Sequence, residues 1–335
     1  MDFDRHCLPL CAAALALAVL LRLGAAGALK PEGEWLQEPQ TASFLLYLQT
    51  GRVVRTDAGA PVLPVLPTEP PATVTEPAPT TLPPVLPVFA PQETEQISMY
   101  YLCDYRPDLD ELLTRPLTWD LTGAGPKVLL IHTHTSESYT PGSPGEYEPS
   151  GDYRTLDPDY NVLHIGALVC DRLNAAGIET IQDRQVHDYP SYNNSYPNAR
   201  AAAQALLEQY PTIELILDLH RDAAETPAGQ LVTECSIGGQ TGAQLMAVVG
   251  TDAHGLEHPH WQDNLALALK LQTLLERENP GICRRLTLSD QRYNQDLGRR
   301  ALLIEVGTAG NTLPQAELAA EELARAVIAL SRGSE

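Results

Sequence analysis

Three apolar runs of strand length constrain the fold of this chain more than any other feature. They lie at residues 128–131, 213–219 and 301–306. A continuous apolar run is typical of a strand that is buried on both faces, as in a parallel sheet. Helical patterns separate these runs, at residues 162–173, 199–209 and 262–278. The last helix is expected to begin at Thr312 with a capping box. This alternation predicts an α/β fold with a mainly parallel central sheet flanked by helices.

Shorter segments also have strand character. They lie at residues 178–181 and 285–288, and at 231–238 and 243–250, which have the pattern of a strand pair. Turn residues at 123–126 precede the first long apolar run. We therefore expect one folded domain over residues 126–335.

The N-terminal segment is expected to engage a membrane. Residues 7–21 form an apolar run without a charge, and Arg22 and a softer apolar run follow. Together the two runs reach the ~20 residues that a spanning helix needs, with Arg22 snorkelling near one end. We predict a membrane anchor over residues 1–30 and a short juxtamembrane segment over residues 31–57. A cleaved signal peptide is the alternative, because residues 24–28 are small.

Proline dominates the next part of the chain. Between residues 58 and 96 it recurs among Thr, Val, Ala and Glu. Because proline lacks an N–H and fixes φ, such a stretch joins neither a helix nor a sheet. We expect residues 58–125 to be a disordered linker and transition that holds the folded domain away from the membrane. With either an anchor or a signal peptide, that domain is expected outside the cytoplasm.

The charge of the chain limits its partners. The formal net charge at pH 7 is −21, whereas a nucleic-acid-binding surface needs a basic patch or stripe. We therefore expect no nucleic-acid partner, and a cationic or a large neutral substrate is compatible with this charge. The six cysteines include no CxxC pair, so neither a zinc ribbon nor a disulfide framework is indicated.

Residues that bind metals or transfer protons lie at the ends of the three apolar runs. His134 and Glu137 follow the first run with an HxxE spacing, His220 follows the second, and Glu305 lies in the third. The carboxyl ends of parallel strands meet at one edge of a sheet. Zinc binds imidazole and carboxylate ligands, and a catalytic site keeps one position open for water. The pattern predicts a zinc site of His134, Glu137 and His220, with Glu305 as the general base.

Two of these assignments have alternatives. His132, two residues before His134, is a rival metal ligand, and the HxxE spacing favours His134 over it. Glu305 has apolar neighbours, so its carboxylate needs a partner or a metal. An ion pair with Arg299 or Arg300 is the structural alternative to catalysis.

Three further side chains are candidates for the surroundings of the metal or for substrate contact. Asp218 lies two residues before His220, and its carboxylate is expected to accept the second N–H of that imidazole. Arg221 is expected either to hold a carboxylate or acyl oxygen of the substrate or to form a surface pair with Asp222. Asn294 lies in a polar, aromatic loop at residues 292–296, whose composition suits contact with carbohydrate or peptide.

Five ordered sequence blocks resemble the stage II sporulation protein P family. They are HTHTSESY at 132–139, VHDYPSYNNSY at 186–196, DLHRDA at 218–223, RYNQDL at 292–297 and LLIEVGTAGNTL at 302–313. The resemblance covers about residues 127–332. The N-terminal apolar segment and the long linker are also typical of that family.

This resemblance implies a peptidoglycan hydrolase that thins the septal wall and drives engulfment during endospore formation. It implies anchoring in the membrane on the mother-cell side of the sporulation septum. The implied partners are peptidoglycan, a lytic transglycosylase and a membrane scaffold protein of the engulfment complex. The catalytic domain of that family is similar to zinc N-acetylmuramoyl-L-alanine amidases and, more remotely, to zinc carboxypeptidases. The resemblance thus implies a zinc amidase that cleaves the stem peptide from the glycan strand, with the ligands and base named above.

One departure from the wall amidases concerns Glu137. Those enzymes take their carboxylate ligand from a separate helix, where this chain has Val162, Leu163 and His164. Glu137 as a ligand therefore rests on the carboxypeptidase-like spacing. Two other functions stay open: a zinc endopeptidase acting on stem-peptide crosslinks, alone or as an additional activity, and a non-enzymatic wall-binding scaffold.

Overall fold

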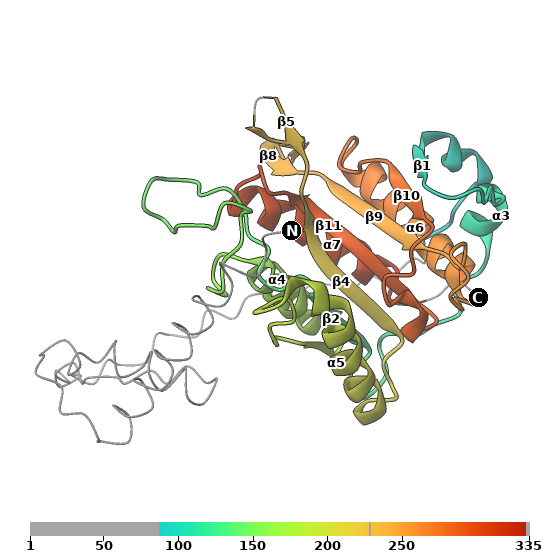
Figure 1. Cartoon of the computed structure of the whole chain (residues 1–335). Coiled ribbons are helices and arrows are strands. Elements are labelled where there is room, and N and C mark those ends of the chain that lie inside the picture. Colours follow the sequence, from blue (N-terminus) through green and yellow to red (C-terminus); the bar gives the residue numbers. More distant parts are fainter. Residues whose placement is uncertain (1–86, 228, 333–335) are drawn as a thin grey trace, which may run out of the picture. The chain divides into compact units, whose positions relative to one another are not determined.

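The structure, a computed structural model, describes residues 87–227 and 229–332 (Figure 1). A seven-stranded sheet in the order β1-β10-β9-β11-β4-β2-β3 lies at the centre of this part of the chain. Its strands are β1 (Met99–Tyr101), β2 (Val128–Ile131), β3 (Thr180–Gln182), β4 (Leu215–Asp222), β9 (Leu245–Gly250), β10 (Leu286–Ser289) and β11 (Ala301–Thr308). Neighbouring strands run parallel except β9 and β11, which are antiparallel. The predicted α/β fold with a mainly parallel sheet is confirmed.

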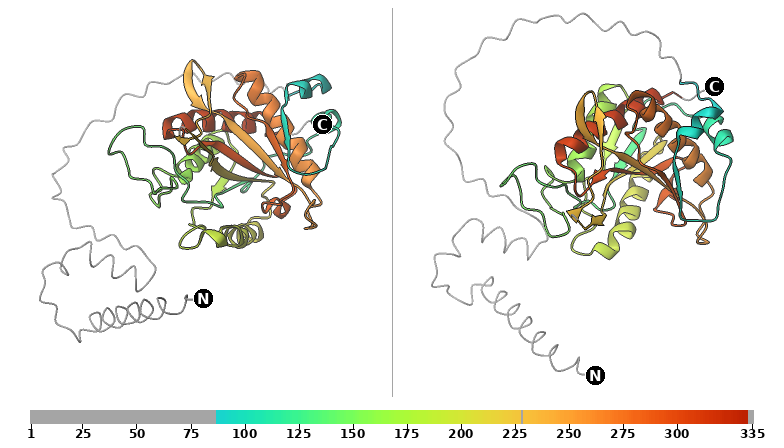
Figure 2. Two further views of the ribbon diagram at one scale, coloured as in Figure 1. Left: turned by 45° about the horizontal axis from the view of Figure 1, so that its top comes forward. Right: turned by 90° about the horizontal axis from the view of Figure 1, so that it is seen from above.

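Helices cover both faces of this sheet (Figure 2). The α-helices are α3 (Leu109–Thr114), α4 (Val162–Ala175), α5 (Ser195–Gln209), α6 (Trp261–Glu278) and α7 (Leu313–Ala329), and the 3₁₀ helices are η2 (Pro91–Gln96), η3 (Tyr192–Asn194) and η4 (Gln295–Leu297). Helix α7 packs against both α4 and α6 on one face. Ala203 of α5 packs on the other face, against Leu129 and Ile216. The predicted helices are confirmed, and Thr312 and Gln315 form the expected capping box of α7.

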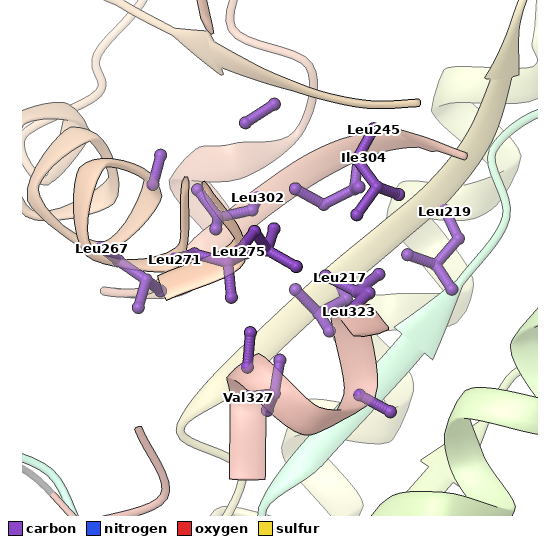
Figure 3. Close-up of a cluster of buried hydrophobic side chains, with 14 of the residues drawn as sticks. Leu217, Leu219, Leu245, Leu267, Leu271, Leu275, Leu302, Ile304, Leu323 and Val327 are labelled. Carbon is purple, nitrogen blue, oxygen red and sulfur yellow. The ribbon is translucent and has the colours of Figure 1, made fainter. Parts of the chain in front are cut away.

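The larger core lies between the sheet and helices α6 and α7 (Figure 3). The side chains labelled there come from β4, β9, β11, α6 and α7; they are Leu217, Leu219, Leu245, Leu267, Leu271, Leu275, Leu302, Ile304, Leu323 and Val327. Successive side chains of a strand point to opposite faces. Because leucines and isoleucine of β4 and β11 fill this core, the alternate residues Asp218, His220 and Glu305 point to the other face.

One predicted strand pairing is wrong. Residues 231–238 and 243–250 meet only at their ends, where Glu234 lies opposite Ala243. Instead β7 (Glu234–Ile237) forms a hairpin with β8 (Gln240–Ala243). Gly238 and Gly239, between them, have φ values of 58° and 83°, and two such residues close a tight hairpin turn. β7 therefore pairs with the nearby β8, and β9 is a strand of the main sheet. A smaller hairpin joins β5 (Glu225–Thr226) and β6 (Gly229–Gln230).

The folded unit begins before the predicted boundary at residue 126. Strand β1 pairs with β10, η2 and α3 pack against α6, and Leu113 and Trp119 are buried. Lys270 of α6 donates a hydrogen bond to the main-chain carbonyl of Leu113. Residues 91–121 thus complete the core and one edge of the sheet, which corrects this part of the predicted linker. The apolar residues of this segment are too scattered to show a period in the sequence.

The predicted anchor (1–30), the juxtamembrane segment (31–57) and residues 58–86 of the linker lie outside the described residues. Their roles stay predictions from the sequence. Across residues 87–227 and 229–332, no helix has the length and apolar character that crossing a membrane requires.

Replacing Leu113 by Ala tests whether residues 91–121 belong to the folded unit. Leu113 is fully buried, and truncating such a side chain is expected to lower the free energy of unfolding by about 2–5 kcal/mol. The control is Leu102→Ala, at a leucine that is 46% exposed, with an expected change below about 0.5 kcal/mol. Denaturant unfolding of the full chain measures both. An effect as small at Leu113 as at Leu102 would contradict the extended boundary.

Candidate active site

Strands β2, β4 and β11 bring the predicted site residues to one edge of the sheet. The three strands are neighbours, and Glu305 of β11 lies opposite His220 of β4. After β2 the chain turns, and the N–H of Glu137 donates to the carbonyl of His134 at 3.0 Å. This turn carries both side chains of the HxxE pair towards β4.

His220 lies at the centre of this group. Its Nδ1 is 3.4 Å from Oε2 of Glu137, and its Nε2 is 2.9 Å from Oδ1 of Asp218. The rings of His134 and His220 meet edge to face with centroids 5.4 Å apart. All four side chains are buried. The structure therefore brings together the three predicted zinc ligands and Asp218, the predicted partner of His220.

Asp218 is fixed from a second side by Thr133. It accepts hydrogen bonds from the N–H of Thr133 at 2.9 Å and from its hydroxyl at 2.6 Å. Burial alone would raise the pKa of Asp218, but His220 and these hydrogen bonds lower it to about 2. Burial alone would likewise lower the pKa of His220, but the carboxylates of Asp218 and Glu137 raise it well above its ordinary value. The two carboxylates thus favour the protonated form of His220.

Unpartnered polar atoms at this edge mark a place for a ligand. Nδ1 of His134 and Oε2 of Glu305 are buried without a hydrogen-bond partner among the described residues. Leaving such atoms unsatisfied costs about 1–3 kcal/mol each, and a cation beside them would remove that cost. Histidine nitrogen and carboxylate oxygen are the donors that zinc prefers.

The side chains as placed do not yet form a metal cage. Within the described residues, no three His, Cys, Asp or Glu side chains have the arrangement of a metal-binding group. The carboxylates of Glu137 and Asp218 lie beside the two nitrogens of His220. The donor types fit zinc, and binding it requires His220 to lose a proton and to exchange a carboxylate for the metal.

The surroundings of Glu305 shift the pKa of its carboxyl. It lies opposite His220 in the sheet register, and burial raises the pKa of its carboxyl to about 8. A carboxyl with a pKa near neutrality suits general acid–base catalysis. The alternative of an arginine partner is wrong: Arg299 pairs with Asp263, and Arg300 donates to the carbonyl of Thr118.

His132 has a structural role in this arrangement. Its Nδ1 lies 3.0 Å from the carbonyl oxygen of Leu219, and its Nε2 lies 2.9 Å from Nε2 of Gln182. A Cβ at Gly166 of α4 would come within 2.4 Å of this ring, so the helix can pack here because residue 166 is glycine. Both ring nitrogens of His132 are engaged, whereas Nδ1 of His134 has no partner among the described residues, and this difference favours His134 as the ligand.

Arg221 holds loops together through its guanidinium. The guanidinium is buried and donates to the carbonyls of Ser138, Asp152 and Tyr153. The expected pair with Asp222 is wrong, since Asp222 forms its ion pair with Arg284 at 2.7 Å. The main-chain N–H of Arg221 also donates to Oε2 of Glu137. Arg221 thus positions the HxxE turn. Its Nη1 has no hydrogen-bond partner among the described residues and the residue lines a cleft, so contact with substrate stays a prediction.

Asn294 also holds a loop in position in this structure. It adopts a left-handed conformation with φ of 59°. Its Nδ2 donates to the carbonyl of Tyr196 at 2.9 Å, and its Oδ1 accepts from Arg200. These contacts hold the loop at 292–297 against the start of α5. Substrate contact by Asn294 stays a prediction.

Four residues without a predicted individual role also contact the site: Arg154, Asp188, Tyr192 and Tyr196. The guanidinium of Arg154 lies 2.8 Å from Asp188 and 3.5 Å from Glu137. Tyr192 stacks on His134 with centroids 4.5 Å apart, and Tyr196 meets the same ring edge-on at 5.5 Å. Two tyrosines four residues apart, in the block VHDYPSYNNSY at 186–196, were a usable signal. Arg154 gave none, because it lies in an irregular loop.

A cleft of about 650 Å³ borders this group. Its lining residues come from the loops after β2, β3 and β4; among them are Ser136, Arg154, Asp188, Tyr189, Tyr192 and Gln230. Its walls combine ionised groups with tyrosine rings. The cleft therefore lies beside Arg154, Asp188 and Tyr192, which contact the candidate site.

Comparison with known proteins identifies the family. Residues 89–328 match the family described as Stage II sporulation protein P (SpoIIP). The chain belongs to this family. It is 29% identical to Stage II sporulation protein P of Bacillus subtilis (strain 168) over 214 residues. This aligned segment covers 61% of this chain and 50% of that protein. The chain thus spans about half the length of this curated relative. The family predicted from the five sequence blocks is confirmed.

Solved structures with a similar arrangement include two amidases. For N-acetylmuramoyl-L-alanine amidase AmiC2 of Nostoc punctiforme the TM-score is 0.39 at 14% identity, over 62% of this chain and 97% of that one. For the CwlD amidase from Clostridioides difficile, in complex with the GerS lipoprotein, the TM-score is 0.34 at 13% identity, over 60% of this chain and 96% of that one. At these scores the similarities carry no conclusion about the site.

The pKa of Glu305 predicts how stability depends on pH. Its folded value of about 8 exceeds the ordinary glutamate value of about 4.3. The folded state therefore binds the extra proton between these two values. The stabilising contribution is complete below about pH 4.3 and is lost as pH rises towards 8, with a slope of at most about 1.4 kcal/mol per pH unit.

Unfolding of metal-free chain, with a chelator present, measures this dependence. Glu305→Gln is expected to gain stability relative to the unmodified chain as pH rises from 5 to 8. The control Glu278→Gln, at an exposed position, is expected to track the unmodified chain. A parallel pH profile for Glu305→Gln would contradict a raised pKa at this position.

Proposed function

We propose that this chain is a peptidoglycan hydrolase of sporulation, and specifically an N-acetylmuramoyl-L-alanine amidase. One observation carries the proposal: a buried group of His134, Glu137 and His220 faces the carboxyl of Glu305 at the edge where β4 and β11 pair. Membership of the Stage II sporulation protein P family supports the sporulation role. The substrate bond would be the amide between the lactyl group of N-acetylmuramic acid and L-alanine.

Zinc is the proposed cofactor, held by His134, Glu137 and His220. When bound, it supplies a Lewis acid that polarises the substrate carbonyl and lowers the pKa of water. Glu305 then accepts a proton on its carboxylate and passes it to the leaving amine. Asp218 orients His220 through the contact at Nε2. Because His220 must be neutral to bind metal, zinc affinity is expected to rise with pH.

The location and partners belong to the same proposal. We place the folded domain outside the cytoplasm, attached by the predicted N-terminal anchor on the mother-cell side of the septum. Peptidoglycan is the proposed substrate, and a lytic transglycosylase and a membrane scaffold are the proposed partners. The family resemblance supports these assignments, and the anchor lies outside the described residues.

A zinc endopeptidase acting on stem-peptide crosslinks is the second candidate. The same residues would hydrolyse either amide, so the products distinguish the two. Stem peptides released from intact glycan strands indicate the amidase. Severed crosslinks with the stem still on the glycan indicate the endopeptidase. A non-enzymatic scaffold would lack at least one member of the His/Glu group, and all are present here.

Replacing Glu305 by Gln tests the proposed base. We expect hydrolysis of purified peptidoglycan to fall by about 10²–10⁴-fold, because proton transfer is lost, while the zinc content stays near one per chain. His220→Ala is the contrasting variant, expected to lose both zinc and activity. Metal analysis and mass spectrometry of the muropeptides give the two readouts. Full activity in Glu305→Gln would remove the assigned base, and a folded chain with neither zinc nor products would remove the enzyme.

A further inference from the structure

A second cleft, of about 660 Å³, lies on the sheet face that carries Glu305. Its floor is Met246 and Val248 of β9 together with Thr287 of β10, and Tyr100 of β1 continues it. The register shows that these side chains share a face with the site. Glu305 lies opposite Met246, Val248 opposite Thr287, and Thr287 opposite Tyr100. Helix α5 covers this face of the sheet near β2. Over β9, β10 and β1 the same face is the floor of the second cleft.

The second cleft lies beside the candidate active site. Asp222, two residues after His220, lines it. A row of aromatic rings also joins the two places. Tyr196 touches His134 with centroids 5.5 Å apart, and it lies 6.1 Å from Tyr293, which lines the second cleft. A substrate with its scissile bond beside Glu305 can therefore extend into this cleft without leaving the sheet surface.

The charge of the second cleft differs from that of the chain. The whole chain carries −21, yet two arginines line this surface. Arg284 is paired with Asp222 at 2.7 Å. Arg285 is exposed, and its guanidinium stacks on the ring of Tyr100 at 4.7 Å. No ion pair joins Arg285 to a carboxylate within the described residues. Arg285 is thus a cation held in place by an aromatic ring and open to an anion.

We propose that the second cleft binds the stem peptide of the substrate and that Arg285 recognises one of its free carboxylates. This inference rests on the proposed function. The sugar rings of a glycan strand are largely uncharged, whereas the stem peptide carries free carboxylates along an extended backbone. A guanidinium matches a carboxylate in a two-pronged, charge-assisted contact. The apolar floor of Met246 and Val248 suits the peptide's methyl and methylene groups.

Kinetics of the full, zinc-loaded chain test the role of Arg285. Two soluble muropeptides serve as substrates: one with free stem carboxylates, the other with the same carboxylates converted to carboxamides. Arg285→Gln is expected to raise KM for the first about tenfold or more, with little change in kcat, because one charge-assisted contact is lost. For the carboxamide substrate the variant and the unmodified chain are expected to have equal KM. Arg285→Lys is expected to recover part of the loss.

Arg325→Gln is the matched control, since Arg325 lies on α7 with its side chain 69% exposed. It is expected to leave both KM values unchanged. An equal loss on both substrates in Arg285→Gln, or no loss on either, would overturn the proposal. Tighter binding of peptide-free glycan than of peptide in this cleft would also overturn it.

A binding measurement separates this inference from the proposed function. Calorimetry of the free stem peptide with Glu305→Gln needs no hydrolysis. Affinity that falls about tenfold or more on adding Arg285→Gln supports the cleft even if the chain proves not to be an amidase. If the chain hydrolyses the substrate but neither KM nor the affinity for the stem peptide depends on Arg285, the amidase proposal stands and the cleft proposal is rejected.

Discussion

The pairing of β4 with β11 is the constraint on which the rest of the structure depends. It places Glu305 opposite His220 and, two residues earlier, Leu303 opposite Asp218. On its other side β11 pairs antiparallel with β9, so strand direction in the sheet reverses at β11. Ligands of open α/β sheets bind at the carboxyl ends of strands where the topology switches. This one register therefore places the candidate site where β11 adjoins β4 and the second cleft where β11 adjoins β9.

A chain of buried and half-buried charged groups holds the site together. It runs from Asp218 through His220 and Glu137 to Arg154 and Asp188. Burying such groups is costly unless each is paired and hydrogen-bonded. The loops that supply them must therefore stay closed around β4, which is what the contacts of Arg221 achieve. The pKa of Glu305 is raised in the same surroundings because its own Oε2 is buried without a partner.

Much of the fold was predictable because its signals are local. The apolar runs that became β2, β4 and β11, and the periods that became α4, α5, α6 and α7, are properties of a few neighbouring residues. Their polar ends indicated the site for the same reason. The segment at 91–121 was not recognised, since β1 and α3 are short and become stable only against β10 and α6. The turn at Gly238 and Gly239 decided the pairing of β7 with β8, which the apolar pattern alone did not indicate.

The sequence by itself determined that a parallel sheet forms and that His134, Glu137, His220 and Glu305 gather at one of its edges. Only the tertiary structure decided what each polar group contacts. His132 and His134 are two residues apart after the same strand, yet Gln182 and the carbonyl of Leu219 engage one ring while Tyr192 stacks on the other. The partners of a buried side chain come from strands and loops distant in sequence. Hydrophobic periodicity fixes which face a residue occupies, whereas its hydrogen bonds depend on which loops fold over that face.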